Sequence, residues 1–168
     1  MEMREGYKQT EIGIIPEDWD SNFINEISTP VRGGSPRPAG DPRFFNGNFI
    51  PWLTVASLTN IPESQINVKQ TSGCLTQAGS LQSRILFPGT LIISNSGATL
   101  GVSKLLSIKC CANDGIAALL NVDQNVNKLF VVYYLNTKTE YFRNVVATGN
   151  GQPNLNTNFW KPFRLEFP

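Results

Sequence analysis

The chain has 168 residues, of which 40% are hydrophobic and 16% are charged, and its formal net charge is +1. This length suits one domain with a sizeable core, and no apolar run approaches the roughly 18–20 residues that a membrane-spanning helix needs. Residues 1–41 hold four basic and eight acidic residues, whereas residues 42–168 hold ten basic and five acidic ones. The excess of positive charge in the second part suits contact with a polyanion. The alternative is that this asymmetry is only that of a solvated surface.

The first predicted elements are a short helix and a structured loop. Trp19, Phe23, Ile24 and Ile27 form an apolar face at helical spacing, which the proline at position 30 ends. Residues 31–43 are rich in glycine and proline and carry three arginines. Guanidinium groups suit phosphate or guanine edges, and the alternative is a solvated surface loop.

The middle of the chain alternates apolar runs with polar segments. Residues 49–55 predict a strand, and residues 56–84 are irregular, with a brief strand at Ile66 and Val68. This segment is rich in amides and hydroxyls, which suits hydrogen bonding to a polar ligand or a long surface loop. Residues 91–93 predict a buried strand that leads into a tight loop at 95–99. The loop either cradles a phosphate, base edge or substrate, or only turns the chain.

The last part predicts three strands, at residues 102–106, 108–111 and 116–120, followed by one long helix. The sequence Asn-Asp-Gly at 113–115 predicts a hairpin turn between the second and third of these strands, with Asp114 as a turn residue or a functional carboxylate. The helix spans residues 127–146, is capped by Asn125 or Asn127, and directs its aromatic side chains mainly into the core. An amide-rich loop at 149–156 and a strand at 163–167 follow.

Several chemistries are excluded by what the chain lacks. Histidine is absent, which removes the commonest general base and both Ser-His-Asp and Cys-His catalysis. The three cysteines lack metal-ligand spacing, so we expect no metal site and reduced thiols, with Cys110 and Cys111 on opposite faces of a strand. No phosphate-binding or dinucleotide fingerprint occurs. The amino-terminal residues lack the apolar centre of a signal peptide, so we expect a cytoplasmic protein.

Six segments in order resemble the target recognition domain of a type I restriction–modification specificity subunit, the HsdS type. They are YKQTEIGIIPEDW at residues 7–19, RGGSP at 32–36, IPW at 50–52, SNSGATLG at 94–101, NDG at 113–115 and GQPNLN at 151–156. The resemblance implies an α/β fold, with a mixed, curved sheet and flanking helices like the specificity domain of DNA adenine methyltransferases. It treats residues 1–168 as one recognition domain, the first of its parent subunit. The spacer helix is absent, so we expect an excised domain or a half-subunit.

The resemblance also implies a non-catalytic function. Such a domain reads one half of a bipartite sequence in double-stranded DNA, and so directs adenine methylation and restriction by partner subunits. The chain itself then needs no cofactor or metal, because S-adenosylmethionine, magnesium and ATP belong to the modification and restriction subunits. Two alternatives remain: a protein-interaction module that docks the modification subunit with little DNA affinity, and a small hydrolase that uses Ser96 or Asp114.

Motifs shared by domains with different DNA targets cannot discriminate bases, so we assign them to scaffold or phosphate positioning. The candidates for positioning on the DNA backbone are Arg32, Ser35, Ser96, Thr99, Lys104, Asn150, Gln152, Asn154 and Lys161. Base-reading residues are expected in the polar segments at 37–48 and 57–84. The candidates there are Arg37, Arg43, Gln65, Lys69, Gln70, Gln82 and Arg84.

Overall fold

The computed structural model describes residues 4–10, 13–96, 99–147 and 163–168. The strands in chain order are β1 Tyr7–Thr10, β2 Gly13–Pro16, β3 Asp20–Phe23, β4 Thr29–Arg32, β5 Phe45–Leu53, β6 Asn67–Val68, β7 Gly73–Leu75, β8 Arg84–Leu86, β9 Leu91–Ser94, β10 Ser103–Leu106, β11 Cys110–Ala112, β12 Ile116–Leu120 and β13 Arg164–Phe167. The helices are α1 Ile24–Ile27, α2 Val55–Thr59, α3 Gln77–Ser80, α4 Lys128–Thr137 and α5 Thr139–Ala147. The predicted amide-rich loop at 149–156 lies outside the described residues.

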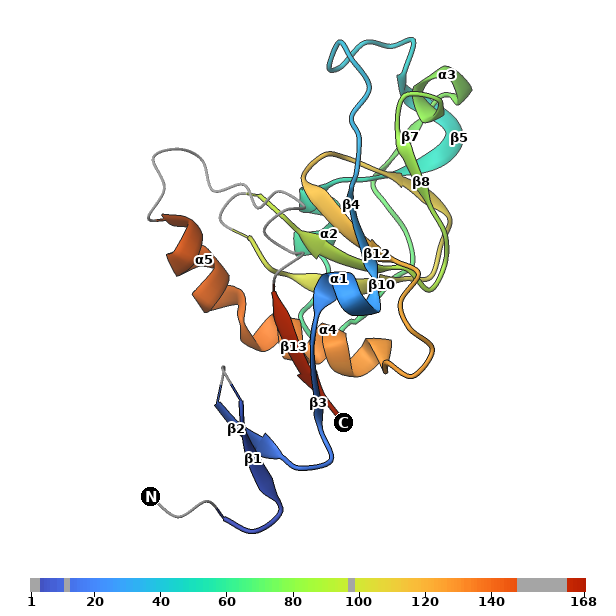
Figure 1. Ribbon diagram of the computed structural model, residues 1–168. Coiled ribbons are helices and arrows are strands. Elements are labelled where there is room, and N and C mark those ends of the chain that lie inside the picture. Colours follow the sequence, from blue (N-terminus) through green and yellow to red (C-terminus); the bar gives the residue numbers. More distant parts are fainter. Residues whose placement is uncertain (1–3, 11–12, 97–98, 148–162) are drawn as a thin grey trace.

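Two mixed sheets form the body of the described chain. The central sheet has the strand order β4-β12-β9-β10-β6, and the outer sheet has the order β7-β5-β11-β8. The pairs β10–β6 and β11–β5 are parallel, and the other pairs of these sheets are antiparallel. The loop after β4, together with α3, β5 and β7, lies at one end of the molecule, and the β1–β2 hairpin lies at the other (Figure 1). The expected mixed fold of strands and helices is confirmed, with nine of the described strands in these two sheets and the pairs β1–β2 and β3–β13 separate from them.

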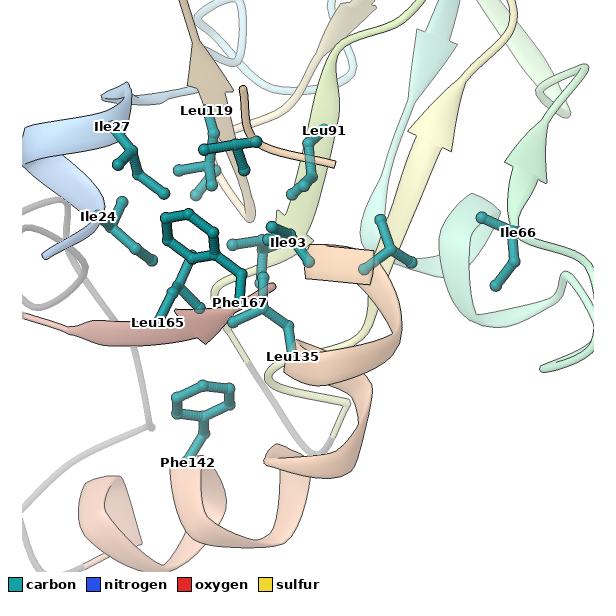
Figure 2. Close-up of a cluster of buried hydrophobic side chains, with 14 of the residues drawn as sticks. Ile24, Ile27, Ile66, Leu91, Ile93, Leu119, Leu135, Phe142, Leu165 and Phe167 are labelled. Atoms are coloured by element: carbon teal, nitrogen blue, oxygen red, sulfur yellow. The ribbon is translucent and has the colours of Figure 1, made fainter. Parts of the chain in front are cut away.

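The apolar run at residues 91–93 forms β9, as predicted, in the middle of the central sheet. Leu91 and Ile93 pack into one buried cluster and Ile92 packs into another. A strand that is buried on both faces needs no alternation of polar and apolar residues. Figure 2 shows the first cluster, in which side chains from α1, β13 and α4 meet those of β9 and β12.

The predicted hairpin at residues 113–115 is wrong. β11 pairs with β5 and β8, whereas β12 pairs with β4 and β9. The Asn-Asp-Gly segment therefore connects the outer sheet to the central one. Gly115 serves this connection because a Cβ there would lie 2.6 Å from Cγ2 of Val55 and 2.9 Å from Oγ of Ser96. The glycine is explained by the close approach of α2 and of the loop after β9.

The segment at 56–84, predicted to be largely irregular, holds more regular structure than expected. The brief strand at Ile66 and Val68 is confirmed as β6, but α2, β7, α3 and the start of β8 also fall within the segment. Threonines begin both helices: Thr54 Oγ1 accepts from the Ser57 N–H at 3.2 Å and Thr76 Oγ1 accepts from the Gly79 N–H at 3.0 Å. These capping bonds satisfy donors that a helix of one turn leaves open.

Both predicted helices differ from the observed ones. The first is limited to α1, because residues 20–23 form β3 and pair with β13 from the other end of the chain. The second begins after Asn127 as expected, since its side chain accepts from the Leu129 and Phe130 N–H groups, but it divides at Lys138 into α4 and α5. Among the described residues, no helix is long and apolar enough to cross a membrane.

The division between α4 and α5 places Phe142 over the backbone of Gly101. A Cβ at Gly101 would lie 2.6 Å from the Phe142 ring, and Gly101 has a φ of +88°, which other L residues rarely adopt. Phe142 is fully buried there in the cluster that contains Leu165. A straight helix would have satisfied the local periodicity, but packing against distant segments bends it.

The cysteines are free thiols, and Cys110 and Cys111 pack into different clusters on opposite faces of β11, as predicted. Burial raises the pKa of Cys110 from 9.0 to about 12, and burial also raises the pKa of Tyr134 from 10.0 to about 12. As the pH rises from 9 to 12, the unfolded chain loses these protons before the folded chain does. Folding is then penalised, because the unfolded state binds fewer protons.

We therefore expect the free energy of unfolding to fall as the pH rises from 9 towards 12. Cys110→Ala removes the larger of the two pKa shifts, so its free energy of unfolding, although lower at neutral pH, should decline less steeply. Urea unfolding of both proteins at a series of pH values measures the two slopes. Equal slopes would contradict the role of the buried thiol.

Candidate nucleic-acid interface

Three segments that are far apart in the sequence meet beside the end of β4. The Gly33 N–H donates to the Ile116 carbonyl at 2.8 Å, and the Gly34 N–H donates to the Ala112 carbonyl at 2.9 Å. From the segment before β8, the Ser83 hydroxyl donates to the Gly34 carbonyl at 2.6 Å. The glycine-rich loop is therefore fixed against the connection between the two sheets.

Asp114 lies at the centre of this junction and is surrounded by donors. Its carboxylate accepts from Ser35 Oγ at 2.5 Å, and Nη2 of Arg37 and of Arg32 lie 3.6 and 3.9 Å from Oδ2. The Asp114 carbonyl also accepts from Nε of Arg32 at 2.6 Å. The Ser35 hydrogen bond, together with the charges of Arg32 and Arg37, holds the pKa of the Asp114 carboxyl below its ordinary value of 3.8. The Asp114 carboxylate thus lies within ion-pair distance of both guanidinium groups, and the Asp114 carbonyl orients that of Arg32.

Two further predicted residues join this group. Nε of Arg84 donates to the Arg32 carbonyl at 2.6 Å, and the side-chain oxygen of Gln82 accepts from the Arg37 N–H at 3.3 Å. We call Arg32, Ser35, Arg37, Gln82, Arg84 and Asp114 the arginine cluster. Beside it runs a shallow groove of about 580 Å³ whose lining includes Arg32, Gln82 and Arg84. The structure thus brings together five of the residues that the sequence predicted for a DNA interface.

Arg43 lies at the end of the molecule that carries α3, and it has a different partner. Its guanidinium forms a two-point contact with Asp41, with Nη2–Oδ2 and Nε–Oδ1 distances of 2.6 and 3.0 Å. It also covers the Phe44 ring at 5.3 Å. The hydrogen bond from Arg43 lowers the pKa of Asp41, and the Arg43 side chain is 72% exposed. Its outer face is accessible to a polyanion.

The candidates at positions 65–70 lie on a separate surface. Gln65 is half-buried and donates through Nε2 to the Asn67 carbonyl at 2.8 Å, whereas Lys69 and Gln70 are exposed. Gln70 lines a recess of about 210 Å³ together with Ser57 and Asn60. Nothing in the described part of the chain joins these residues to the arginine cluster.

Lys104 does not face solvent, so its expected role as a phosphate contact is corrected. It is 2% exposed, and its Nζ donates to the carbonyls of Gln65 and Pro62 at 2.5 and 2.9 Å. Burial lowers the pKa of the ammonium group, against the opposing charge of Glu63. The side chain fastens the loop between α2 and β6 to strand β10. Its role is structural.

Lys104→Ala is therefore expected to lower the free energy of unfolding by about 2 kcal/mol, because two part-buried carbonyls lose their donor and the aliphatic stem loses its packing. The salt dependence of duplex DNA binding should stay unchanged. Urea unfolding and binding titrations at several salt concentrations measure the two quantities. Lys109→Ala, at an exposed position, serves as the control, with a smaller loss of stability. If Lys104→Ala instead decreased the slope of log affinity against log salt by about one, Lys104 would contact a DNA phosphate and the structural role would be wrong.

The loop after β9 is held by a serine that the sequence candidates did not include. The buried Ser94 hydroxyl donates to the Thr99 carbonyl and accepts from the Val102 N–H at 3.0 Å. Ser96 and Thr99 are themselves half-buried, with Ser96 close to Gly115. The candidates Asn150, Gln152, Asn154 and Lys161 lie outside the described residues.

Sequence reasoning missed Ser83 and Asn136 and undervalued Asp114. Ser83 sits next to a predicted candidate, but its partner, Gly34, is 49 positions away. Asn136 accepts from the Ser103 N–H at 2.8 Å and donates to the Ser103 carbonyl at 3.1 Å, so its amide completes the edge of β10. Asp114 is predicted as a turn residue or a functional carboxylate. Its contacts with Arg32 and Arg37, about 80 positions away, cannot be predicted from the local sequence.

The arrangement suits recognition of an anion with directional donors. Guanidinium groups form paired hydrogen bonds to phosphate or guanine, and amides form them to adenine. Among the described residues, no group of histidine, cysteine, aspartate or glutamate side chains is arranged to hold a metal ion. The arginine cluster combines fixed charge with an exposed groove, which fits contact with a nucleic acid better than with a small neutral molecule.

Known proteins with a similar sequence or fold include specificity subunits of type I restriction enzymes. The chain is 27% identical over 164 residues to the type I restriction enzyme MjaIX specificity subunit of Methanocaldococcus jannaschii, an alignment that covers 96% of this chain and 37% of that subunit. The HsdS subunit of Thermoanaerobacter tengcongensis superposes with a TM-score of 0.68 at 17% identity, over 98% of this chain and 36% of that one. The type I S subunit of M. genitalium superposes with a TM-score of 0.60 at 14% identity, over 89% of this chain and 34% of that one.

These structural likenesses establish the fold, and the chain spans only about a third of the length of the proteins it matches. The family is shown by the model of the type I restriction modification DNA specificity domain, which matches residues 16–168. That range contains every element from β3 onwards and the whole arginine cluster. The chain therefore belongs to the type I restriction modification DNA specificity domain family.

Proposed function

We propose that this chain is one DNA target recognition domain, the first of its parent subunit, and that it reads one half of a bipartite sequence in double-stranded DNA. In that role it directs adenine methylation and restriction, which modification and restriction subunits carry out. The domain itself has no catalytic role and needs no cofactor, and it works in the cytoplasm, where the DNA lies. Family membership supports the class of function, since the family is a specificity domain.

The arginine cluster is the observation that carries the proposal. Arg32 and Arg37 are exposed enough for DNA to reach them, with 46% and 72% of their side-chain surfaces accessible, and both lie against Asp114, whose carbonyl accepts from Nε of Arg32. Fixed donors lose little conformational entropy on binding, so they can distinguish one base from another. We assign Arg37, Gln82 and Arg84 to base edges, and Arg32 and Ser35 to positioning on the backbone. Lys69, Gln70 and Arg43 then extend the contact along the DNA.

The test uses the full subunit assembled with its modification subunits in cells, followed by sequencing of methylated adenines. The wild type should methylate one bipartite motif. Arg84→Ala should relax the motif at one or two positions of one half only, because a good paired contact contributes roughly 1–3 kcal/mol of discrimination. Lys128→Ala, whose Nζ donates to the Gly89 carbonyl away from the cluster, should leave the motif unchanged.

Two results would contradict the proposal. An assembled wild-type enzyme that methylates without sequence preference would exclude target reading altogether. An Arg84→Ala enzyme that assembles and keeps both halves of the motif intact would place base reading elsewhere in the domain.

A further inference from the structure

Leu81 has the most exposed large hydrophobic side chain in the described part of the chain, with 84% of its surface accessible. It directly follows α3, and its N–H donates to the Gln77 carbonyl at 3.4 Å. The helix packs closely against the residue before β5: the Thr76 N–H donates to the Phe44 carbonyl at 3.0 Å, and a Cβ at Gly79 would lie only 2.2 Å from the same oxygen. The exposure of Leu81 is thus imposed by a packed turn.

A second apolar side chain lies in the same groove. Ile85 of β8 is 38% exposed and lines the groove together with Leu81, Arg32 and Arg84. Ser83, between the two apolar residues, is tied to the Gly34 carbonyl at 2.6 Å. Single exposed apolar residues are common on protein surfaces, but this pair shares a groove with two guanidinium groups. That combination calls for a ligand with both negative charge and apolar groups.

Double-stranded DNA fits this combination better than a protein partner does. The cores of protein interfaces are depleted of charged residues, whereas Arg32 and Arg84 line this groove beside the apolar pair. In the major groove of DNA, thymine presents a methyl group that apolar side chains contact, and phosphates lie on either side. Two guanidinium groups next to an apolar pair therefore suit the edge of a base pair with phosphate nearby.

We infer that Leu81 is a specificity-determining residue that contacts the 5-methyl group of a thymine, with Ile85 in the same groove, Arg84 at a neighbouring base edge and Arg32 at the DNA backbone. The inference rests on the proposed function and adds one base identity to it. Leu81 does not support the fold, because so little of its surface is buried. Its replacement should change binding without changing stability.

The experiment measures duplex binding by the full subunit assembled with its modification subunits. The probe is the methylation motif, with each thymine of the half that Arg84→Ala relaxes replaced in turn by deoxyuridine. For the wild type, one replacement should weaken binding about three- to fivefold, the effect of one methyl group. Leu81→Ala should bind the thymine duplex weaker by a similar factor and respond little to that replacement. Leu129→Ala, an exposed leucine on α4, should behave as the wild type does.

The outcomes separate this inference from the proposed function. Loss of all sequence preference in the wild-type enzyme would overturn both. A sequence-specific enzyme in which Leu81→Ala keeps the wild-type response to deoxyuridine would overturn the methyl contact alone. A uniform loss of affinity of Leu81→Ala for every duplex would also overturn the methyl contact, because it would indicate that Leu81 inserts between base pairs. A loss of modification-subunit binding by Leu81→Ala, with DNA binding intact, would overturn it too. A half-site without an A·T pair would also overturn it.

Discussion

Gly33→Ala is expected to lower the free energy of unfolding by about 3 kcal/mol or more, one of the largest effects of any single substitution proposed for this chain. The added methyl carbon would lie 2.0 Å from the Asn113 carbonyl oxygen and 2.6 Å from that of Ala112. Both obstacles are backbone atoms in the connection between the outer and central sheets. They cannot move aside without breaking the hydrogen bonds that Gly33 and Gly34 make there.

Urea unfolding of Gly33→Ala measures this loss, and Gly73→Ala is the matched control. Gly73 also lies at a strand, but no atom comes within 4 Å of the position that its Cβ would take. Alanine there should change the free energy of unfolding by less than about 1 kcal/mol, because it mainly restricts the unfolded chain. Similar losses in both variants would show that the close approach at Gly33 is not what requires a glycine.

The close approach at Gly33 also shows what the sequence can and cannot predict. The Gly-Gly-Ser and Asn-Asp-Gly motifs were visible as special loops, but their contact joins residues about 80 positions apart. The turn rule for Asn-Asp-Gly assumes that neighbouring strands pair with each other. Here β11 and β12 find partners in different sheets, so a rule based on local sequence gave the wrong topology.

Predictions succeeded where burial alone determines the structure. Residues 91–93 and 116–120 form central strands because their side chains are buried on both faces, and an unbroken apolar run records that directly. The start of α4 was predicted for a different, local reason, since the cap of Asn127 involves only the next three residues. The division at Lys138 was missed, because it depends on the packing of Phe142 against Gly101 and β13.

The residues of the candidate site could also be predicted only where local sequence decides their position. Arg32, Arg37 and Arg84 were chosen as donors by residue type and loop composition, and they do lie together. Lys104 is a candidate only by its charge, within the predicted strand at 102–106, and it is buried, because its ammonium group donates to two carbonyls of the loop before β6. A charged residue type predicts a donor, but only the fold shows whether that donor faces solvent.

Asp114→Asn is expected to increase the affinity of the assembled enzyme for non-specific DNA and to reduce its preference for the target half-site about tenfold. Asparagine keeps the size of the side chain but removes the charge that holds Arg32 and Arg37. The local positive charge rises by one, so more counterions are released on binding, and the slope of log affinity against log salt should steepen by up to about one. Arg37 loses its ion pair with the carboxylate, whereas Arg32 keeps its hydrogen bond to the Asp114 carbonyl. Loss of one ordered base contact reduces the discrimination between bases by roughly 1–3 kcal/mol.

Asp123→Asn distinguishes this effect from a general gain of positive charge. Asp123 is exposed in the connection between β12 and α4, where its carboxylate accepts from the Asn125 N–H at 2.8 Å. It changes the net charge by the same amount as Asp114→Asn but leaves the arginines in place. Binding titrations with target and scrambled duplexes should show a reduced preference for the target only in Asp114→Asn. If both variants kept the wild-type preference, the carboxylate would serve the fold and would not orient the arginines for reading DNA.

A separate measurement of stability as a function of pH checks whether the Asp114 carboxylate serves the fold. The pKa of Asp114 is lowered in the folded chain, so its contribution to stability is present above pH 3.8 and is lost as the pH falls below that value. Asp114→Asn should therefore show a weaker loss of stability in acid.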